Sequence, residues 1–166
     1  EHDVAGYRKL DIETVLGWQP DAIVVSVSET GEGGEWVAQH GAGVSVRSAR
    51  NATIRRVTSH GTQNGIVLDR VGSSQIYDND CSFLSGWGIA MWRSSGNTIC
   101  RNSLDFCVRG YSHDVYNRGQ DSAGLLMFEQ CSDNVIALNS ATHGGDGVFG
   151  FAGREALGER PAKDAG

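Results

Sequence analysis

The chain has 166 residues, with 23 glycines and only 2 prolines, so it is long enough for one domain with a buried core and must turn often without proline. Its 14 Lys and Arg residues against 20 Asp and Glu residues give a net charge of −6, which disfavours nucleic acid and anionic membranes as partners. No apolar run approaches the roughly 20 residues that cross a bilayer, so we expect no membrane span.

Residues 1–42 repeat less clearly than the rest of the chain. They contain an apolar stretch from Ala22 to Val27 that can form an early strand, preceded by a stretch with mixed helical and extended signals. The open end of a repeat fold exposes core and unpaired backbone, so such folds need a terminal cap. We therefore predict that residues 1–42 form an N-terminal cap or an irregular first coil.

A glycine followed by a short apolar strand recurs five times after this segment. The intervals between these glycines are 22, 23, 36 and 23 residues, so one repeat carries about 13 residues more than its neighbours. A fixed period of this length is typical of stacked repeats. The five expected strands begin at Gly43, Gly65, Gly88, Gly124 and Gly147.

A second register supports the first. An isoleucine lies eleven or twelve residues after each of the first four glycines, at Ile54, Ile76, Ile99 and Ile136. Asparagine recurs three residues after it (Asn79, Asn102, Asn139) and two residues before it (Asn97, Asn134). Asparagine tolerates the left-handed conformation of corners, and its amide can hydrogen-bond the same amide one layer away. The pattern predicts stacked coils with several short strands each.

The resulting fold prediction is an all-β parallel β-helix, or solenoid, of about five coils of 22–23 residues. Leucine-rich repeats share the period, but this chain lacks their leucine consensus and helical return. We place the solenoid at residues 43–153, with an insertion at about 110–123 and a polar tail at 154–166. Alternation along the strands predicts two inward stacks, one of Val44, Ile66, Ile89, Leu125 and Val148, the other of Val46, Leu68, Met91 and Met127.

The glycine strands and asparagine register resemble the right-handed parallel β-helix proteins of the pectin-lyase-like superfamily, in particular bacterial β-helix-repeat proteins linked to polysaccharide processing. The resemblance covers about Gly43 to Gly153. It implies a secreted, periplasmic or cell-surface location and a polysaccharide or oligosaccharide ligand. The superfamily includes lyases, hydrolases, epimerases, binding modules and adhesins. The paired aspartates of polygalacturonases and the Asp-Pro motif of mannuronan epimerases are absent, so no catalytic residue is carried over from either.

The end of the solenoid offers little to close its core. After Phe151 the chain is polar and contains no further coil pattern. The tail folds back as a lid, or a further chain or segment continues the stack. Because superfamily members usually have more coils, we expect this chain to be part of a longer solenoid.

The insertion is the first candidate for a catalytic site, because loops on rigid scaffolds carry function. Proton abstraction beside a uronate carboxylate needs a group that moves the proton and a cation that stabilises the developing charge. His113, Tyr116, Arg118 and Asp121 provide these residue types. The alternative interpretation is a solvated loop rich in turn formers.

The corner before the fifth strand is the second candidate. His143 and Asp146 lie three residues apart in a glycine-rich turn, so they can act as base and orienting group or can share a cation. The matching corner one coil earlier opens the insertion, which predicts that loop and corner emerge on the same side. Alternatively, His143 hydrogen-bonds a neighbouring coil and Asp146 has an ordinary turn role.

The outer face of the glycine strands is the third candidate. Strand alternation points Trp92 and Phe128 outward in neighbouring coils, followed by Arg93 and Glu129. This set can form an aromatic platform for a sugar, with Arg109 and Tyr111 at the start of the insertion also contacting substrate. Equally, the two aromatic rings can be covered by another part of the protein.

No metal site is predicted from the cysteines. Cys81, Cys100, Cys107 and Cys131 lack zinc-type spacing and are interpreted as buried free thiols. We expect no cofactor; calcium remains possible at Asp78, Asn79 and Asp80, where oxygen ligands cluster.

We therefore predict a carbohydrate-active β-helix protein, a polysaccharide lyase or glycoside hydrolase acting in a groove beside the 110–123 loop. An acidic protein suits a polyanionic substrate only if Arg70, Arg93, Arg109 and Arg118 form a local basic strip. The alternatives are a non-catalytic carbohydrate-binding or surface adhesion module, and a structural solenoid segment.

Overall fold

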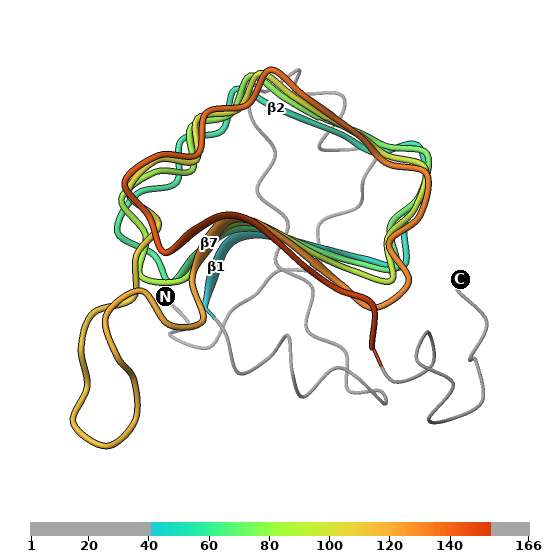
Figure 1. Cartoon of the computed structure of the whole chain (residues 1–166). Coiled ribbons are helices and arrows are strands. Elements are labelled where there is room, and N and C mark those ends of the chain that lie inside the picture. Colours follow the sequence, from blue (N-terminus) through green and yellow to red (C-terminus); the bar gives the residue numbers. More distant parts are fainter. Residues whose placement is uncertain (1–40, 154–166) are drawn as a thin grey trace, which may run out of the picture.

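The computed structural model describes residues 41–153, which form one stack of coils (Figure 1). Expectations for residues 1–40 and 154–166 lie outside these described residues. Five strands of six residues are present: β1 (Ala42–Arg47), β3 (Asn64–Asp69), β5 (Trp87–Trp92), β7 (Ala123–Phe128) and β9 (Asp146–Phe151). Four strands of three residues alternate with them: β2 (Thr53–Arg55), β4 (Gln75–Tyr77), β6 (Thr98–Cys100) and β8 (Val135–Ala137).

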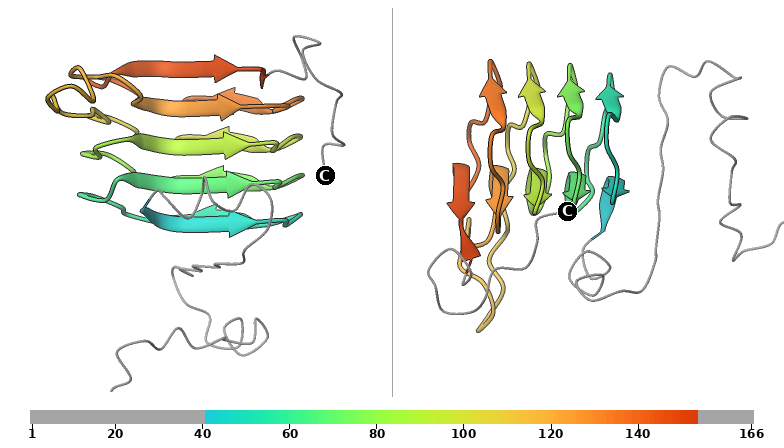
Figure 2. Two further views of the ribbon diagram at one scale, coloured as in Figure 1. Left: turned by 90° about the horizontal axis from the view of Figure 1, so that it is seen from below. Right: turned by 90° about the vertical axis from the view of Figure 1, so that its right-hand side faces the viewer.

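The strands form two parallel sheets that run along the stack (Figure 2). The long strands pair in the order β1-β3-β5-β7-β9, and the short strands pair in the order β2-β4-β6-β8. The predicted parallel β-solenoid of about five coils is thus confirmed. The long strands begin one residue before each glycine, and Ile54, Ile76, Ile99 and Ile136 are the central residues of the short strands.

The core lies inside the coils and contains the predicted inward stacks. Val44, Ile66, Ile89 and Leu125 pair in register and are buried. Val148 pairs with Leu125 in the same stack but is 56% exposed, because no described coil covers the far side of β9. Residues 41–153 contain no helix with the length and apolar character needed to cross a membrane.

Close packing requires the glycine at the second position of β1, β3, β5 and β7. A Cβ atom on Gly88 would lie 2.5 Å from the carbonyl oxygen of Gly124 and 3.0 Å from Leu104. A Cβ atom on Gly65 would meet Cys81 and Gly88 at 2.5 Å. The inward residue of the next corner thus occupies the space that a side chain would need, which explains why glycine repeats at this position.

The predicted asparagine ladders are present and link each coil to the next. Asn79 Nδ2 donates to Asn102 Oδ1 at 2.9 Å, and Asn102 Nδ2 donates to Asn139 Oδ1 at 2.9 Å. The backbone amides of Asn79 and Asn102 also donate to these oxygens. A second ladder joins Asn97 Nδ2 to Asn134 Oδ1 at 3.1 Å. Buried amides with satisfied partners fix the corners of the coils in register.

The outer face of the long-strand sheet carries a second apolar cluster. Val67, Ala90 and Leu126 point outward, as alternation predicts, and pack with Trp87 and Ala123. All five are less than one tenth exposed. This buried outer face leads toward the insertion, which projects from the stack between β6 and β7 (Figure 1).

Candidate functional site

The insertion is tied to the solenoid at its base. The Gly119 amide donates to the Arg109 carbonyl at 2.8 Å, which closes the loop, and Ser112 and Tyr116 form an antiparallel bridge within it. The Gly145 amide donates to Cys107 at 3.0 Å, and the Asp146 amide donates to Ser122 at 2.9 Å. The loop and the Asp146 corner therefore emerge together, as their register predicted.

The packing between loop and corner leaves no room for side chains at the contact. A Cβ atom on Gly145 would lie 2.4 Å from the carbonyl oxygens of Gly119 and Ser122. Gly119 has a φ of +84°, a left-handed conformation that suits glycine. The two glycines thus let the loop base rest directly on the corner.

A cavity of about 350 Å³ lies where the insertion meets the outer face of β7 and β9. Of the described residues that line it, four are aromatic, three are charged and the others are small or apolar. These residues are Trp87, Arg109, Tyr116, Asp121, Ser122, Ala123, Leu126, Phe128, Asp146 and Phe149.

The charged groups of this cavity differ in how they are engaged. The Arg109 guanidinium lies 4.5 Å from the centre of the Tyr116 ring, and its Nε donates to the Asp121 carbonyl at 3.3 Å. Within residues 41–153, the carboxylates of Asp121 and Asp146 have no ion pair and no side-chain hydrogen bond. Both carboxylates are therefore available to a ligand.

A second, more open hollow of about 350 Å³ adjoins the first and shares Asp146 with it. Arg118, His143 and the Gly144-Gly145 backbone line this hollow. His143 Nδ1 lies 2.9 Å from the Thr142 hydroxyl, and its ring stacks on Phe106 at 4.8 Å between centres. Its contact with a neighbouring coil is thus ring stacking.

The predicted catalytic residues divide between these places. Tyr116, Asp121 and Asp146 line the first cavity, whereas Arg118 and His143 line the second hollow with Asp146. His113 lines neither.

The predicted substrate-binding residues of the insertion are also separated. Arg109 lines the first cavity, whereas Tyr111 lines neither hollow. Tyr111 is exposed, and its hydroxyl lies 3.2 Å from His113 Nδ1. His113 Nε2 in turn lies 3.3 Å from the Asp114 carboxylate. The histidine and tyrosine of the outer loop therefore contact each other and stand apart from the cavity.

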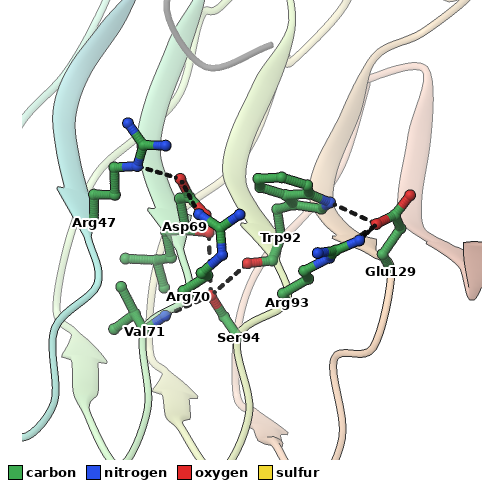
Figure 3. A network of polar contacts seen from close by, with 9 residues as sticks. Arg47, Asp69, Arg70, Val71, Trp92, Arg93, Ser94 and Glu129 are labelled. Carbon is green, nitrogen blue, oxygen red and sulfur yellow. Dashed lines mark hydrogen bonds and ion pairs between the residues drawn. The ribbon is translucent and has the colours of Figure 1, made fainter. Parts of the chain in front are cut away.

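The predicted platform on the outer face forms a polar network of its own (Figure 3). Glu129 Oε2 accepts hydrogen bonds from Trp92 Nε1 at 3.1 Å and from Arg93 Nε at 3.0 Å and Nη2 at 2.8 Å. The guanidinium groups of Arg70 and Arg93 lie 4.8 and 4.9 Å from the Trp92 ring centre. Trp92 is only 8% exposed, so its ring faces offer little surface to a sugar.

The network continues across β3 and β1. Arg47 Nε lies 2.8 Å from the Asp69 carboxylate, and Arg70 Nη1 lies 3.2 Å from it. Burial raises the pKa of Asp69 above the ordinary carboxyl value, although Arg70 and Arg47 act in the opposite direction. Two of the four arginines of the expected basic strip, Arg70 and Arg93, are thus engaged with acidic partners.

Two aromatic wall residues, Trp87 and Phe149, were not among the sequence candidates. Trp87 and Asp146 occupy the same register position, because Trp87 pairs with Ala123 and Ala123 pairs with Asp146. Phe149 lies beside Leu126 in the neighbouring strand. Both residues could therefore have been predicted from the coil register, because it places them beside Asp146 and the strand that follows the insertion.

Metal-ligating side chains do not gather in the described part of the chain. No group of three His, Cys, Asp or Glu residues there is arranged to hold a metal ion. At the possible calcium position, Asp78 pairs with Arg101 at 2.7 Å, Asn79 belongs to the ladder, and Asp80 contacts His60 at 2.9 Å. The four cysteines are free; Cys81 and Cys107 are buried, and Cys100 and Cys131 are half-buried.

Most of the chain, including four of the five coils, matches a known protein family. Residues 22–143 match the family described as NosD, periplasmic copper-binding protein. This match covers well over half of the chain. The chain belongs to the NosD family. The family's description places it in the periplasm, which agrees with the expected location outside the cytoplasm. Comparisons of this NosD-family chain with curated proteins and with solved structures gave no significant match.

Proposed function

We propose that this NosD-family chain is a periplasmic binding protein whose cavity beneath the insertion holds a saccharide. The observation that supports this most is the combination of aromatic walls with two available carboxylates. Ring faces such as those of Tyr116 and Phe149 pack against the apolar faces of sugars, while carboxylates such as Asp146 accept hydrogen bonds from hydroxyl groups. The cavity of about 350 Å³ is within the usual size range of ligand pockets.

The two histidines predicted to transfer protons lie outside the cavity, which supports binding over turnover. His113 contacts Tyr111 and Asp114 away from the cavity, and His143 lies in the adjoining hollow. The Tyr116 ring is stacked with Arg109. A general acid or base must reach the proton that it transfers, and of the groups predicted to move protons only Tyr116, which is stacked with Arg109, and the carboxylates of Asp121 and Asp146 line the cavity. We therefore propose binding as the function and test turnover through Asp146.

The family description raises copper binding, but the described residues do not fit a copper ion. Copper(I) selects thiolate and thioether ligands, whereas copper(II) commonly takes histidine. Burial raises the thiol pKa of Cys81 and of Cys107 to about 12, which disfavours their thiolates. The Cys131 thiol donates to the carbonyls of Phe128 and Glu129. Neither the histidines nor the cysteines of residues 41–153 belong to a group of three His, Cys, Asp or Glu residues that could hold a metal ion, so we assign no copper site to this part of the chain.

The proposed function predicts a saccharide affinity that depends on the cavity walls. The test is calorimetric titration of the whole chain with a panel of neutral, acidic and amino oligosaccharides, with reducing ends measured in parallel. Phe149→Ala should weaken binding of the preferred oligosaccharide by about tenfold, because it removes an aromatic wall. Phe83→Ala is the control, since Phe83 is also an exposed phenylalanine but lies outside both hollows.

Two results would contradict the proposal. One is the absence of binding to every oligosaccharide in the panel. The other is an equal loss of affinity in the Phe149 and Phe83 variants, because binding would then not involve the cavity. Release of reducing ends by the unmodified chain, lost in Asp146→Asn, would replace simple binding with hydrolysis.

A further inference from the structure

The charge of the cavity indicates which class of saccharide it accepts. Among the described residues that line it, three side chains are charged, Arg109, Asp121 and Asp146, which gives one positive and two negative groups. The positive group is already engaged with the Tyr116 ring and the Asp121 carbonyl, whereas both carboxylates lack polar partners among the described residues. The polar groups available to a ligand are therefore mainly anionic.

The two carboxylates are held by different parts of the chain. Asp146 is the first residue of β9 and pairs with Ala123 of β7. Asp121 ends the insertion with a left-handed φ of +51°, and its carbonyl accepts from Arg109. The amide of Asp146 donates to Ser122, which follows Asp121 directly. Backbone contacts thus bring the two acidic residues to one cavity.

A polyanionic saccharide is a poor match for this surface. Of the four arginines expected to form a basic strip, Arg70 and Arg93 are engaged with Asp69 and Glu129, and Arg109 is stacked on Tyr116. Arg118 faces the adjoining hollow, where the carboxylate of Asp146 would oppose an anion. The chain as a whole carries a net charge of −6, which further opposes an acidic polymer.

We infer that the cavity selects a saccharide carrying a free, protonated amine, with the ammonium group bound by Asp121 and Asp146. The inference rests on the proposed saccharide-binding function and narrows its ligand class. An ammonium group offers three donors, and carboxylate oxygens accept them in charge-assisted hydrogen bonds. Aromatic faces such as Phe149 also attract a cation. A neutral saccharide would leave the negative charge of both carboxylates without a counter-charge.

The test compares two sugars that differ only at the amine. Glucosamine oligosaccharides with free amines and their fully N-acetylated counterparts, matched in length, are titrated into the whole chain at mildly acidic pH. The free-amine form should bind at least about tenfold more tightly, because acetylation removes the charge and two of the three N–H donors. The combined Asp121→Asn and Asp146→Asn variant should lose this preference. Asp114→Asn is the control for loss of one carboxylate outside the cavity, and it is matched in charge and in loop position by the single Asp121→Asn variant, which should weaken the preference.

The possible results distinguish a wrong amine preference from a wrong assignment of saccharide binding. Equal or tighter binding of the acetylated oligosaccharide, reduced by Phe149→Ala, would overturn the amine preference and leave saccharide binding intact. Loss of the preference in Asp114→Asn as well would also overturn it, because the effect would then reflect overall charge. Failure of both oligosaccharides and of every other saccharide to bind would overturn the proposed function itself.

Discussion

Asp105 shows how one residue fixes the corner that supports the cavity. Its Oδ1 accepts hydrogen bonds from the Ser140 hydroxyl at 2.7 Å and from the Thr142 amide and hydroxyl at 2.7 and 2.8 Å. Its Oδ2 accepts from the Ser103 hydroxyl at 3.1 Å. Thr142 leads directly into His143 and Asp146. The carboxylate thus ties the third coil to the turn that carries the candidate site.

These hydrogen bonds predict a pH-dependent contribution to stability. Burial alone would raise the pKa of Asp105, but the bonds from Ser140, Thr142 and Ser103 outweigh it and lower the pKa below its ordinary value. A group whose pKa is lower in the folded state stabilises the fold above its unfolded pKa, about 4 for aspartate. That stabilisation is lost as the pH falls through the lower, folded value.

We predict that Asp105→Ala lowers the free energy of unfolding by about 1 kcal/mol at neutral pH, a modest loss because water screens a partly exposed carboxylate. The difference from the unmodified chain should shrink as the pH falls below about 4, where the native carboxylate gains its proton. Urea unfolding at several pH values measures both. Asp114→Ala serves as the control, and a pH-independent difference would contradict the role of the charge.

The long strands depend on one glycine each, and the need for it varies along the stack. Gly88 lies between Leu104 and the backbone of Gly124, so it has no room for a Cβ atom. Gly147 occupies the equivalent position in β9, but within residues 41–153 the one heavy atom near its Cβ position is the Ala141 carbonyl oxygen at 3.5 Å, an ordinary contact. The same sequence position is therefore critical inside the stack and tolerant at β9.

This difference predicts that the same substitution, glycine to alanine, destabilises the fold at Gly88 and has little effect at Gly147. Gly88→Ala should lower the free energy of unfolding by about 1–3 kcal/mol, because overpacking forces backbone and side chains to shift. Gly147→Ala should change it by less than about 0.5 kcal/mol, as is usual for substitutions at tolerant sites. Thermal unfolding followed by circular dichroism measures both variants. Equal destabilisation by the two would show that strand conformation, and not packing between coils, requires the glycine.

At the scale of the whole molecule, the features predicted from sequence are those that repeat with the coil. The inward stack through Ile66 and Ile89 and the ladder through Asn102 follow from a fixed period, because each residue meets its equivalent one coil away. The meeting of the insertion with the Asp146 corner follows from the same register. Periodicity thus determines which segments become neighbours.

The features that sequence could not predict are choices among outward side chains. Trp92 and Phe128 share a register position, yet Trp92 donates to Glu129 and is buried, while Phe128 lines the cavity. Arg93 and Glu129 both have left-handed backbone conformations at the strand ends, and Arg93 Nη2 donates to Glu129 Oε2 at 2.8 Å. Such pairings depend on the conformation of each corner and on which partners compete for a side chain. Neither of these repeats with the coil, so the sequence period does not predict them.

The solenoid and its insertion are separable parts of the molecule. All pairs between β5 and β7 form outside the insertion, including Ile89 with Leu125 and Met91 with Met127. The bonds that seat the loop base involve Cys107, Arg109 and Ser122, which lie at its two ends. The outer part of the loop, residues 111–117, contributes Tyr116 to the cavity. The scaffold should therefore keep its stability without this outer part, whereas the cavity should not keep its ligand.

Replacing residues 111–117 with two glycines tests this separation. The melting temperature should change by less than about 3 °C, roughly 1 kcal/mol for a domain of this size, because loop length alone has a small entropic effect. Oligosaccharide affinity should fall by about tenfold through loss of an aromatic wall. Tyr116→Ala in the intact loop isolates the contribution of the ring itself. A large drop in melting temperature would mean that the insertion helps to hold the third and fourth coils together, and unchanged affinity would place the ligand elsewhere on the solenoid.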